Sequence, residues 1–166
     1  MEFQAGQAPT ADELTALVPG YVVQGTQQDV ASSTTLEDSN IVVPIDGLCE
    51  VRLSVRYHHQ GGGIRWAWRA TGTADMASRD ILSAGENASG GVHDISDMRF
   101  RQIVTLDQPH DVTSSISGAT SHMISERCIC TGEGEIVFQF AQNVSHADAT
   151  QVLEASFATV QPLREL

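Results

Sequence analysis

The sequence predicts an all-β protein, an antiparallel β-sandwich or jelly roll of about eight to nine strands with one short N-terminal helix and an extended arm. Three observations predict it. Apolar and polar residues alternate with a period of two in most segments after residue 20. Glycine-rich or serine-rich stretches separate these segments. A length of 166 residues fits one domain. We therefore divide the chain into an arm and helix at 1–20 and a β-sandwich domain at 21–166.

The first twenty residues predict one helix from Ala11 to Leu17, preceded by the extended arm. Thr10 and Glu13 form a capping-box pattern, and a Pro-Gly pair follows the helix. A helix this short is not stable alone, so it must dock on its own domain or on a neighbouring subunit. We favour contact with another chain. The candidate contact residues are Phe3, Leu14, Leu17, Val18 and Tyr21.

The strands follow from the alternation of apolar and polar residues. The clearest segments are LCEVRLSVRY (48–57), IRWAWRA (64–70), MRFRQIVTL (98–106), EIVFQFAQ (135–142) and QVLEASFATV (151–160). Weaker candidates are YVVQGTQ (21–27), NIVVPI (40–45) and HMISERCIC (122–130). We expect Phe138, Phe140 and Phe157 in the interior of the sandwich.

The breaks between strands are of two kinds. HQGGG (59–63) separates two strands, and TGEGE (131–135) predicts a short hairpin turn. Residues 83–97 and 107–118 predict two long loops.

The chain is strongly acidic, with 21 Asp and Glu against 9 basic residues, all of them arginine, and a formal net charge of -12. This charge repels phosphate backbones, so we expect no nucleic-acid partner. The N-terminus has neither the basic nor the apolar region of a signal peptide, and no apolar run reaches the ~20 residues that cross a bilayer. We expect no membrane partner. Three cysteines, an odd number, exclude a complete disulfide framework.

Histidines and cysteines raise the question of a metal site. His58 and His59 are adjacent, so on a strand they point to opposite faces. Cys128 and Cys130 lie on one side of a strand, where buried apolar cysteines are common. The sequence has no nucleophile elbow, phosphate loop or dinucleotide fingerprint. We therefore expect no metal, no cofactor and no enzymatic activity.

Two other groups of residues have a chemical and an architectural interpretation. Arg65, Trp66, Trp68 and Arg69 could form a platform on which a sugar ring stacks, but Ile64 shares the side of the tryptophans, so we favour a core role for the indoles. The segment from Asn143 to Asp148, with its histidine, resembles part of a catalytic site in composition; we interpret it as a polar loop.

Three segments together resemble structural proteins of tailed phages that infect actinobacteria. The first is FQAGQAPTADELTALVP at the N-terminus. The second contains a Ser/Thr-Thr-Leu-acidic motif, here Ser33 to Leu36 followed by Glu37, before a long alternating strand. The third is the closing pair of strands around Ala141 to Asn143, with Ala149-Thr150 beyond. Phe140 stands where the family pattern has a tryptophan.

The resemblance implies a virion structural protein built as a β-sandwich and assembled in the cytoplasm of the host bacterium. We favour a capsid decoration or minor capsid protein that binds the outer head shell and stabilises it. The implied partners are the major capsid protein and further copies of this chain in a homotrimer. The alternative is a minor tail or head-fibre protein with a receptor-binding or glycan-binding role.

Overall fold

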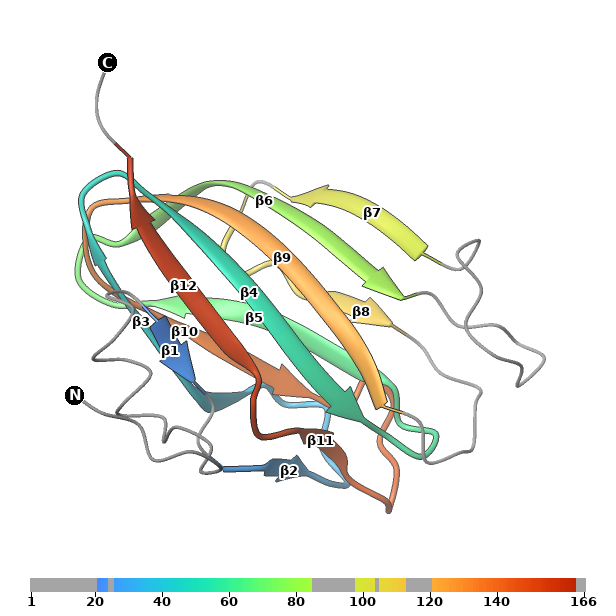
Figure 1. The fold of residues 1–166 in the computed structure, drawn as a ribbon. Helices are drawn as coiled ribbons and strands as arrows, with labels where there is room; N and C mark the ends of the chain where they lie inside the picture. The colour runs from blue at the N-terminus through green and yellow to red at the C-terminus, as the bar shows by residue number, and fades with distance from the viewer. Residues whose placement is uncertain (1–20, 24–25, 85–97, 104, 113–120, 164–166) are drawn as a thin grey trace, which may run out of the picture.

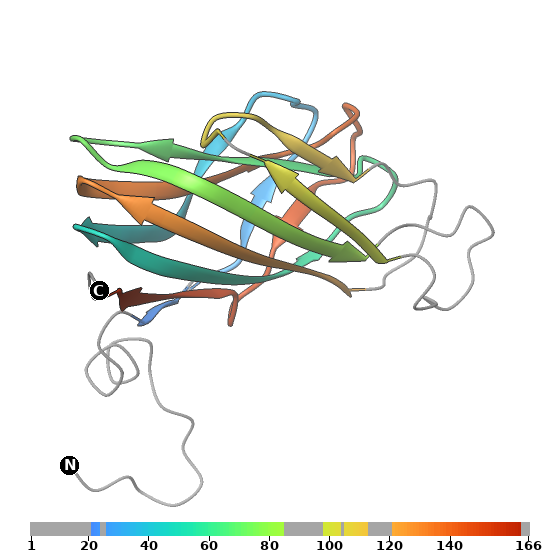
Figure 2. The same cartoon turned by 90° about the horizontal axis from the view of Figure 1, so that it is seen from above.

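The computed structural model describes residues 21–23, 26–84, 98–103, 105–112 and 121–163, and these residues form two antiparallel β-sheets packed face to face (Figures 1 and 2). The prediction of an all-β sandwich is therefore confirmed. The predicted arm and helix at 1–20 lie outside the described residues. None of the described residues forms a helix long and apolar enough to cross a membrane.

The described part of the chain contains twelve strands, more than the eight or nine predicted. They are β1 (Tyr21–Val23), β2 (Gln28–Val30), β3 (Glu37–Asp46), β4 (Cys49–His58), β5 (Ile64–Ala70), β6 (Asp75–Ala84), β7 (Met98–Ile103), β8 (His110–Val112), β9 (Ser121–Thr131), β10 (Glu133–Ala141), β11 (Thr150–Val152) and β12 (Phe157–Pro162). Sequence reasoning missed β2, β6 and β8, and it merged β11 with β12.

Eight consecutive strands, β3 to β10, have the winding order of a jelly roll. The smaller sheet has the order β3-β10-β5-β8, and the larger sheet contains the run β4-β9-β6-β7. Every connection from β3 to β10 except that between β6 and β7 crosses from one sheet to the other. Among these strands, all pairs but β6–β7 therefore join strands that are not consecutive in sequence. The remaining strands widen the larger sheet, where β12 joins β4, β1 joins β12, and β11 links β4 to β2.

The alternation of residues sets which side chains enter the core. On β4 the odd positions from Cys49 to Tyr57 are at most 2% exposed, as predicted. Their neighbours Arg52 and Arg56 point to solvent. The same pattern buries Ile64, Trp66 and Trp68 on β5 and Ile136, Phe138 and Phe140 on β10, all at 0% exposed. Burial of these apolar side chains supplies the main stabilisation of the sandwich.

Phe157 corrects one expectation about the core. It pairs with Ser54 and is only partly buried, whereas its neighbour Ala158 is 0% exposed. The predicted continuous strand is broken at 153–156, where Ala155 has a φ of 66°. On β12 the side chain of Ala158 therefore points toward the core, and the side chain of Phe157 lies on the outer face of the larger sheet.

The turn at 131–135 also differs from its prediction. Gly132 connects β9 to β10, but these strands belong to different sheets and do not pair as a hairpin. Gly132 has a φ of +85°, and its carbonyl accepts a hydrogen bond of 2.8 Å from the backbone N of Gly47. Two crossover turns are thereby joined at one end of the sandwich.

Candidate functional site

Three loops meet at the lower end of the sandwich in Figure 1 and form what we call the loop platform. They are residues 31–36 between β2 and β3, residues 59–63 between β4 and β5, and residues 142–149 between β10 and β11. The platform unites segments that are far apart in sequence because the jelly roll brings the ends of their strands together.

Gln142 joins the loops of the platform and is 0% exposed. Its backbone N donates to the carbonyl of Ser33 at 3.2 Å. Its side-chain oxygen accepts from the backbone N of His146 at 2.9 Å, and its side-chain nitrogen donates to the carbonyl of Asp148 at 2.7 Å. The buried side-chain amide of Gln142 therefore binds the backbone of its own 142–149 loop, and its backbone N ties that loop to the 31–36 loop.

The glycines of the 59–63 loop provide the space for this arrangement. A Cβ at Gly62 would lie 2.9 Å from the side-chain nitrogen of Gln142, and Gly61 has a φ of +110° beside the ring of His146. The carbonyl of Gly62 accepts from the backbone N of Val144 at 2.9 Å. The glycine run predicted from sequence as a break between strands thus also allows close approach of a second loop.

The loop platform is held by hydrogen bonds within and between its loops. Its single carboxylate is Asp148, whose backbone N donates to Nδ1 of His146 at 3.1 Å, so this imidazole nitrogen already has a partner within its own loop. Val144 is 54% exposed. The Asn143–Asp148 segment is therefore part of a hydrogen-bonded surface loop, as the polar-loop interpretation predicted.

The predicted glycan platform on β5 is not available for stacking. Trp66 and Trp68 are each 0% exposed, and only the flanking Arg65 and Arg69 reach the surface. A sugar needs an exposed indole face, so these four residues do not form such a site. The favoured interpretation of the tryptophans as core residues agrees with the structure.

Both indoles bind a buried carboxylate that sequence reasoning missed. Trp66 Nε1 donates to Glu126 at 3.0 Å and Trp68 Nε1 at 2.6 Å, although the tryptophans and the glutamate belong to opposite sheets. Arg79 Nε donates to the same carboxylate at 2.5 Å, and its Nη1 donates to the carbonyl of Gln108 at 2.8 Å. We call Trp66, Trp68, Arg79 and Glu126 the core polar network; it satisfies a buried charge pair and connects the two sheets.

The three cysteines are buried. Cys49 lies opposite Cys130 on neighbouring strands, and Cys128 faces the same interior. Burial, together with the neighbouring Cys49 and acidic groups, raises the pKa of the Cys130 thiol to about 12. Burial also raises the pKa of Cys49 and, with the charge of Glu126, raises that of Cys128 well above its ordinary value.

We expect no thiol of the folded protein to react with DTNB at mildly alkaline pH, because the thiolate is the nucleophile and burial suppresses it. After unfolding in guanidinium, all three thiols should react at the rate of a free cysteine. The unfolded sample is the control for reagent and protein concentration. Rapid labelling of any thiol before unfolding would contradict the buried positions of these side chains.

Three of the histidines that the structure describes are buried in the core. Tyr57, His59 and His122 stack in the interior, with ring centroids of the two histidines 5.0 Å apart, and His110 meets Trp66 edge-on at 4.6 Å. Among the residues that the structure describes, no group of three or more His, Cys, Asp or Glu is placed to hold a metal ion.

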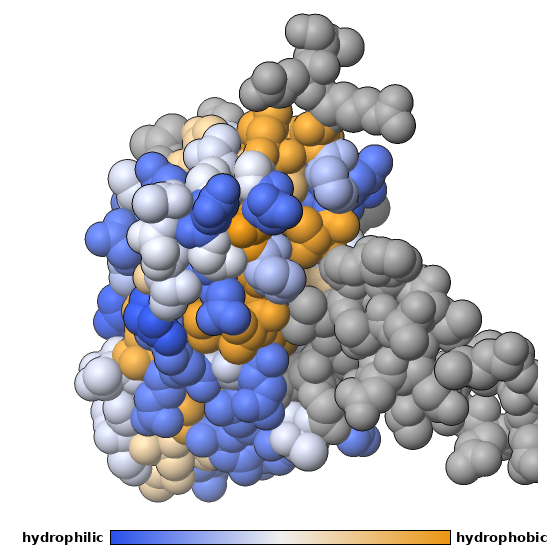
Figure 3. Space-filling view, turned by 90° about the vertical axis from the view of Figure 1, so that its left-hand side faces the viewer, coloured by the Kyte–Doolittle hydropathy of each residue, from blue (hydrophilic) through white to orange (hydrophobic). Residues whose placement is uncertain are grey.

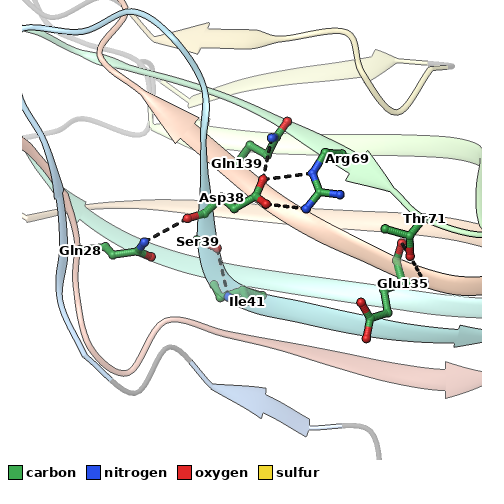
Figure 4. Close-up of polar contacts among 8 residues, drawn as sticks. All are labelled: Gln28, Asp38, Ser39, Ile41, Arg69, Thr71, Glu135 and Gln139. Carbon is green, nitrogen blue, oxygen red and sulfur yellow. Dashed lines mark hydrogen bonds and ion pairs between the residues drawn. The ribbon is translucent and has the colours of Figure 1, made fainter.

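A surface cluster on the smaller sheet ties β2, β3, β5 and β10 together (Figure 4). Asp38 accepts hydrogen bonds from Arg69 and, at 2.7 Å, from Gln139. The hydrogen bond from Arg69 outweighs desolvation and lowers the pKa of the Asp38 carboxyl. Gln28 binds the backbone of β3 at Asp38 and Asn40, so a side chain covers this part of the sheet edge. Asp38 and Arg69 are about half exposed, so the ion pair contributes little stability.

Comparison of the chain with protein-family models, with curated proteins and with solved structures gave no match.

Proposed function

We propose that this chain is a structural protein of a tailed-phage virion, a decoration or minor capsid protein that binds the outer surface of the head shell and stabilises it. In this proposal the partners are the major capsid protein and further copies of the chain in a homotrimer. The role is mechanical, without catalysis, cofactor, nucleic acid or membrane.

The observation that carries the proposal is the meeting of two resembling segments at the loop platform. Ser33 to Leu36 and Ala141 to Asn143 are more than a hundred residues apart, yet the backbone N of Gln142 donates to the carbonyl of Ser33. Two segments that carry the resemblance thus take part in one tertiary contact. The jelly roll supports the proposal because viral capsid proteins use this architecture, although the same fold carries other functions.

The mechanism follows from the forces on a filled head. Packaged DNA presses outward on the shell, and a protein bound across several capsid subunits adds interface area that opposes their separation. The net charge of -12 favours a position on the outer surface, away from the packaged nucleic acid.

The N-terminal residues are the proposed contact with the shell or with another subunit. They are Phe3, Leu14, Leu17 and Val18, outside the described residues, and Tyr21, which begins β1 at the edge of the larger sheet. Apolar residues form a strip on the left-hand side of the molecule as drawn in Figure 1, among polar ones (Figure 3). At the turn between β3 and β4, Leu48 is 36% exposed and its carbonyl accepts from the backbone N of Leu163. An apolar surface close to β1 supports a docking role for this segment.

Deletion of residues 1–20 should abolish co-sedimentation with capsids while the sandwich stays folded. The deletion removes the candidate contact residues Phe3, Leu14, Leu17 and Val18 but retains β1, whose backbone pairs with β12. Circular dichroism and a thermal melt of the truncated protein control for folding. Undiminished co-sedimentation of a folded truncated protein would refute the role of this segment.

The location of the chain in the virion tests the proposal as a whole. A gold-labelled antibody against the native protein should decorate the heads of intact particles. Label confined to the tail tip would refute the head location and favour the tail or fibre alternative. No label on intact or opened particles would refute a virion role.

A further inference from the structure

We propose that the outer face of the larger sheet, over β4, β6 and β9, is a docking surface for an acidic polypeptide that also offers an apolar contact. This inference rests on the proposed function, in which the acidic polypeptide belongs to the head shell. It adds a second contact to the one proposed for the N-terminal segment, which enters the same sheet at its edge strand β1.

The strand register places cations together on this face. Arg52 lies directly opposite Arg127, and Arg127 lies opposite Asp80 on the next strand. The side chains of Arg52 and Arg127 are 66% and 53% exposed, and Arg56 is exposed further along β4. Arginines thus extend over two neighbouring strands on a chain that is acidic as a whole.

The nearby carboxylate of Glu50 presents little negative charge to a partner. Its side chain is only 6% exposed because Arg52 and Arg127 both bind it, at 2.5 Å and 2.6 Å. Burial alone would raise the pKa of Glu50, but the hydrogen bonds from Arg127 and Arg52 outweigh it and hold the pKa below its usual value. The carboxylate therefore stays ionised under its arginines, and the guanidinium groups form the accessible layer.

Apolar side chains lie beside these arginines. Met123 is opposite Arg56 and is 54% exposed. Leu82 is opposite Ser125, one diagonal step from Met123, and is 39% exposed. Two of the four large apolar side chains that are exposed in the described part of the chain therefore share one sheet face with the arginines. Methionine and arginine are both enriched in protein interfaces.

The opposite face of the sandwich has the reverse character. On the smaller sheet the exposed residues include Asp38, Asp46, Glu133 and Glu135. Asp46 and Glu133 lie directly opposite each other across β3 and β10. Arg65 and Arg69 also reach the surface of the smaller sheet, but the acidic residues described on that sheet outnumber them, so the face of the larger sheet complements an acidic partner better. We favour a polypeptide over nucleic acid, because three arginines beside two carboxylates do not form the continuous basic surface that phosphate backbones need.

The test compares matched charge reversals in binding to capsids that lack this protein. Arg127→Glu should weaken binding by about tenfold or more, because it places like charges across the interface. Arg69→Glu on the smaller sheet is the control: its side chain is 44% exposed and is also ion-paired to a carboxylate, so the change in charge is the same. We expect Arg69→Glu to stay within about twofold of wild type, and added salt to weaken the wild-type complex.

A second pair of variants tests the apolar contact. Met123→Asp should weaken capsid binding, whereas Val144→Asp on the loop platform, equally exposed at 54%, should not. Circular dichroism verifies that all four variants are folded.

Equal binding by Arg127→Glu and Arg69→Glu, or a loss confined to Val144→Asp, would overturn the docking surface and leave the proposed function intact. Failure of the wild-type protein to bind capsids would overturn both. A self-association that Arg127→Glu abolishes without capsids, or wild-type binding to DNA, would also overturn this assignment.

Discussion

Replacing Glu126 with alanine is expected to lower the free energy of unfolding by about 3–5 kcal/mol, the range for breaking a buried ion pair by removal of one partner. Arg79 is 0% exposed and would remain as a buried cation without its carboxylate. Trp66 and Trp68 would each lose the acceptor of their indole N–H. A buried donor without an acceptor is costly, so the effect exceeds the loss of one hydrogen bond.

The measurement is guanidinium denaturation followed by tryptophan fluorescence, since the chain contains only these two tryptophans. Glu50→Ala is the matched control, because Glu50 is also buried and binds two arginines, but those arginines are 66% and 53% exposed and can be hydrated once the carboxylate is removed. Solvent screens that cluster, so we expect a loss of at most about 1 kcal/mol. An equal loss of unfolding free energy in the two variants would show that the core polar network stabilises the protein no more than the Glu50 cluster does.

Gly132→Ala should destabilise the protein by about 2–5 kcal/mol, the sum of left-handed backbone strain and overpacking. Gly132 has a φ of +85°, and a Cβ at this position would lie 2.0 Å from the carbonyl oxygen of Thr73. Because that oxygen belongs to the backbone of the neighbouring turn, relief requires movement of the turn itself.

Gly47→Ala separates the two causes. Gly47 has a φ of +75° but nothing within 4 Å of its Cβ position, so only the strain of about 1–2 kcal/mol is expected. Chemical denaturation of both variants gives the comparison. A Gly132 variant that is no less stable than the Gly47 variant would show that the turn adjusts at little cost.

The core strands could be predicted from the sequence because apolar and polar side chains alternate clearly along them. In IRWAWRA the two tryptophans share a side with Ile64, and a protein with 5% aromatic residues needs such side chains inside. In LCEVRLSVRY every second residue is apolar, which leaves one choice of buried face. The strand β6 was missed because DMASRDILSA has no continuous alternation. A register shift between Met76 and Ser78 inserts an extra residue and turns Arg79, rather than Ser78, toward the core.

The sequence could not predict which residues bind the buried charges of Glu126 and Arg79. Glu126 occupies the inward phase of HMISERCIC, between Ile124 and Cys128, and this was a detectable signal that a carboxylate enters the core. Its partners lie on β5 and β6, about fifty to sixty residues away. Crossover connections bring these strands together, and no local pattern specifies which strand pairs with which.

The sequence by itself determined the all-β class, the inward faces of β4, β5 and β10 and the position of most turns, because a period of two is a local property of the chain. Only the tertiary structure decided the jelly-roll strand order, which side chains of β6 point inward after its bulge, and the outward position of Phe157. It also decided the meeting of Ser33 with Gln142 and the gathering of Arg52, Arg56 and Arg127 on one face. The physical reason is that alternation fixes two sides of a strand but not its register, and one inserted residue exchanges the two sides.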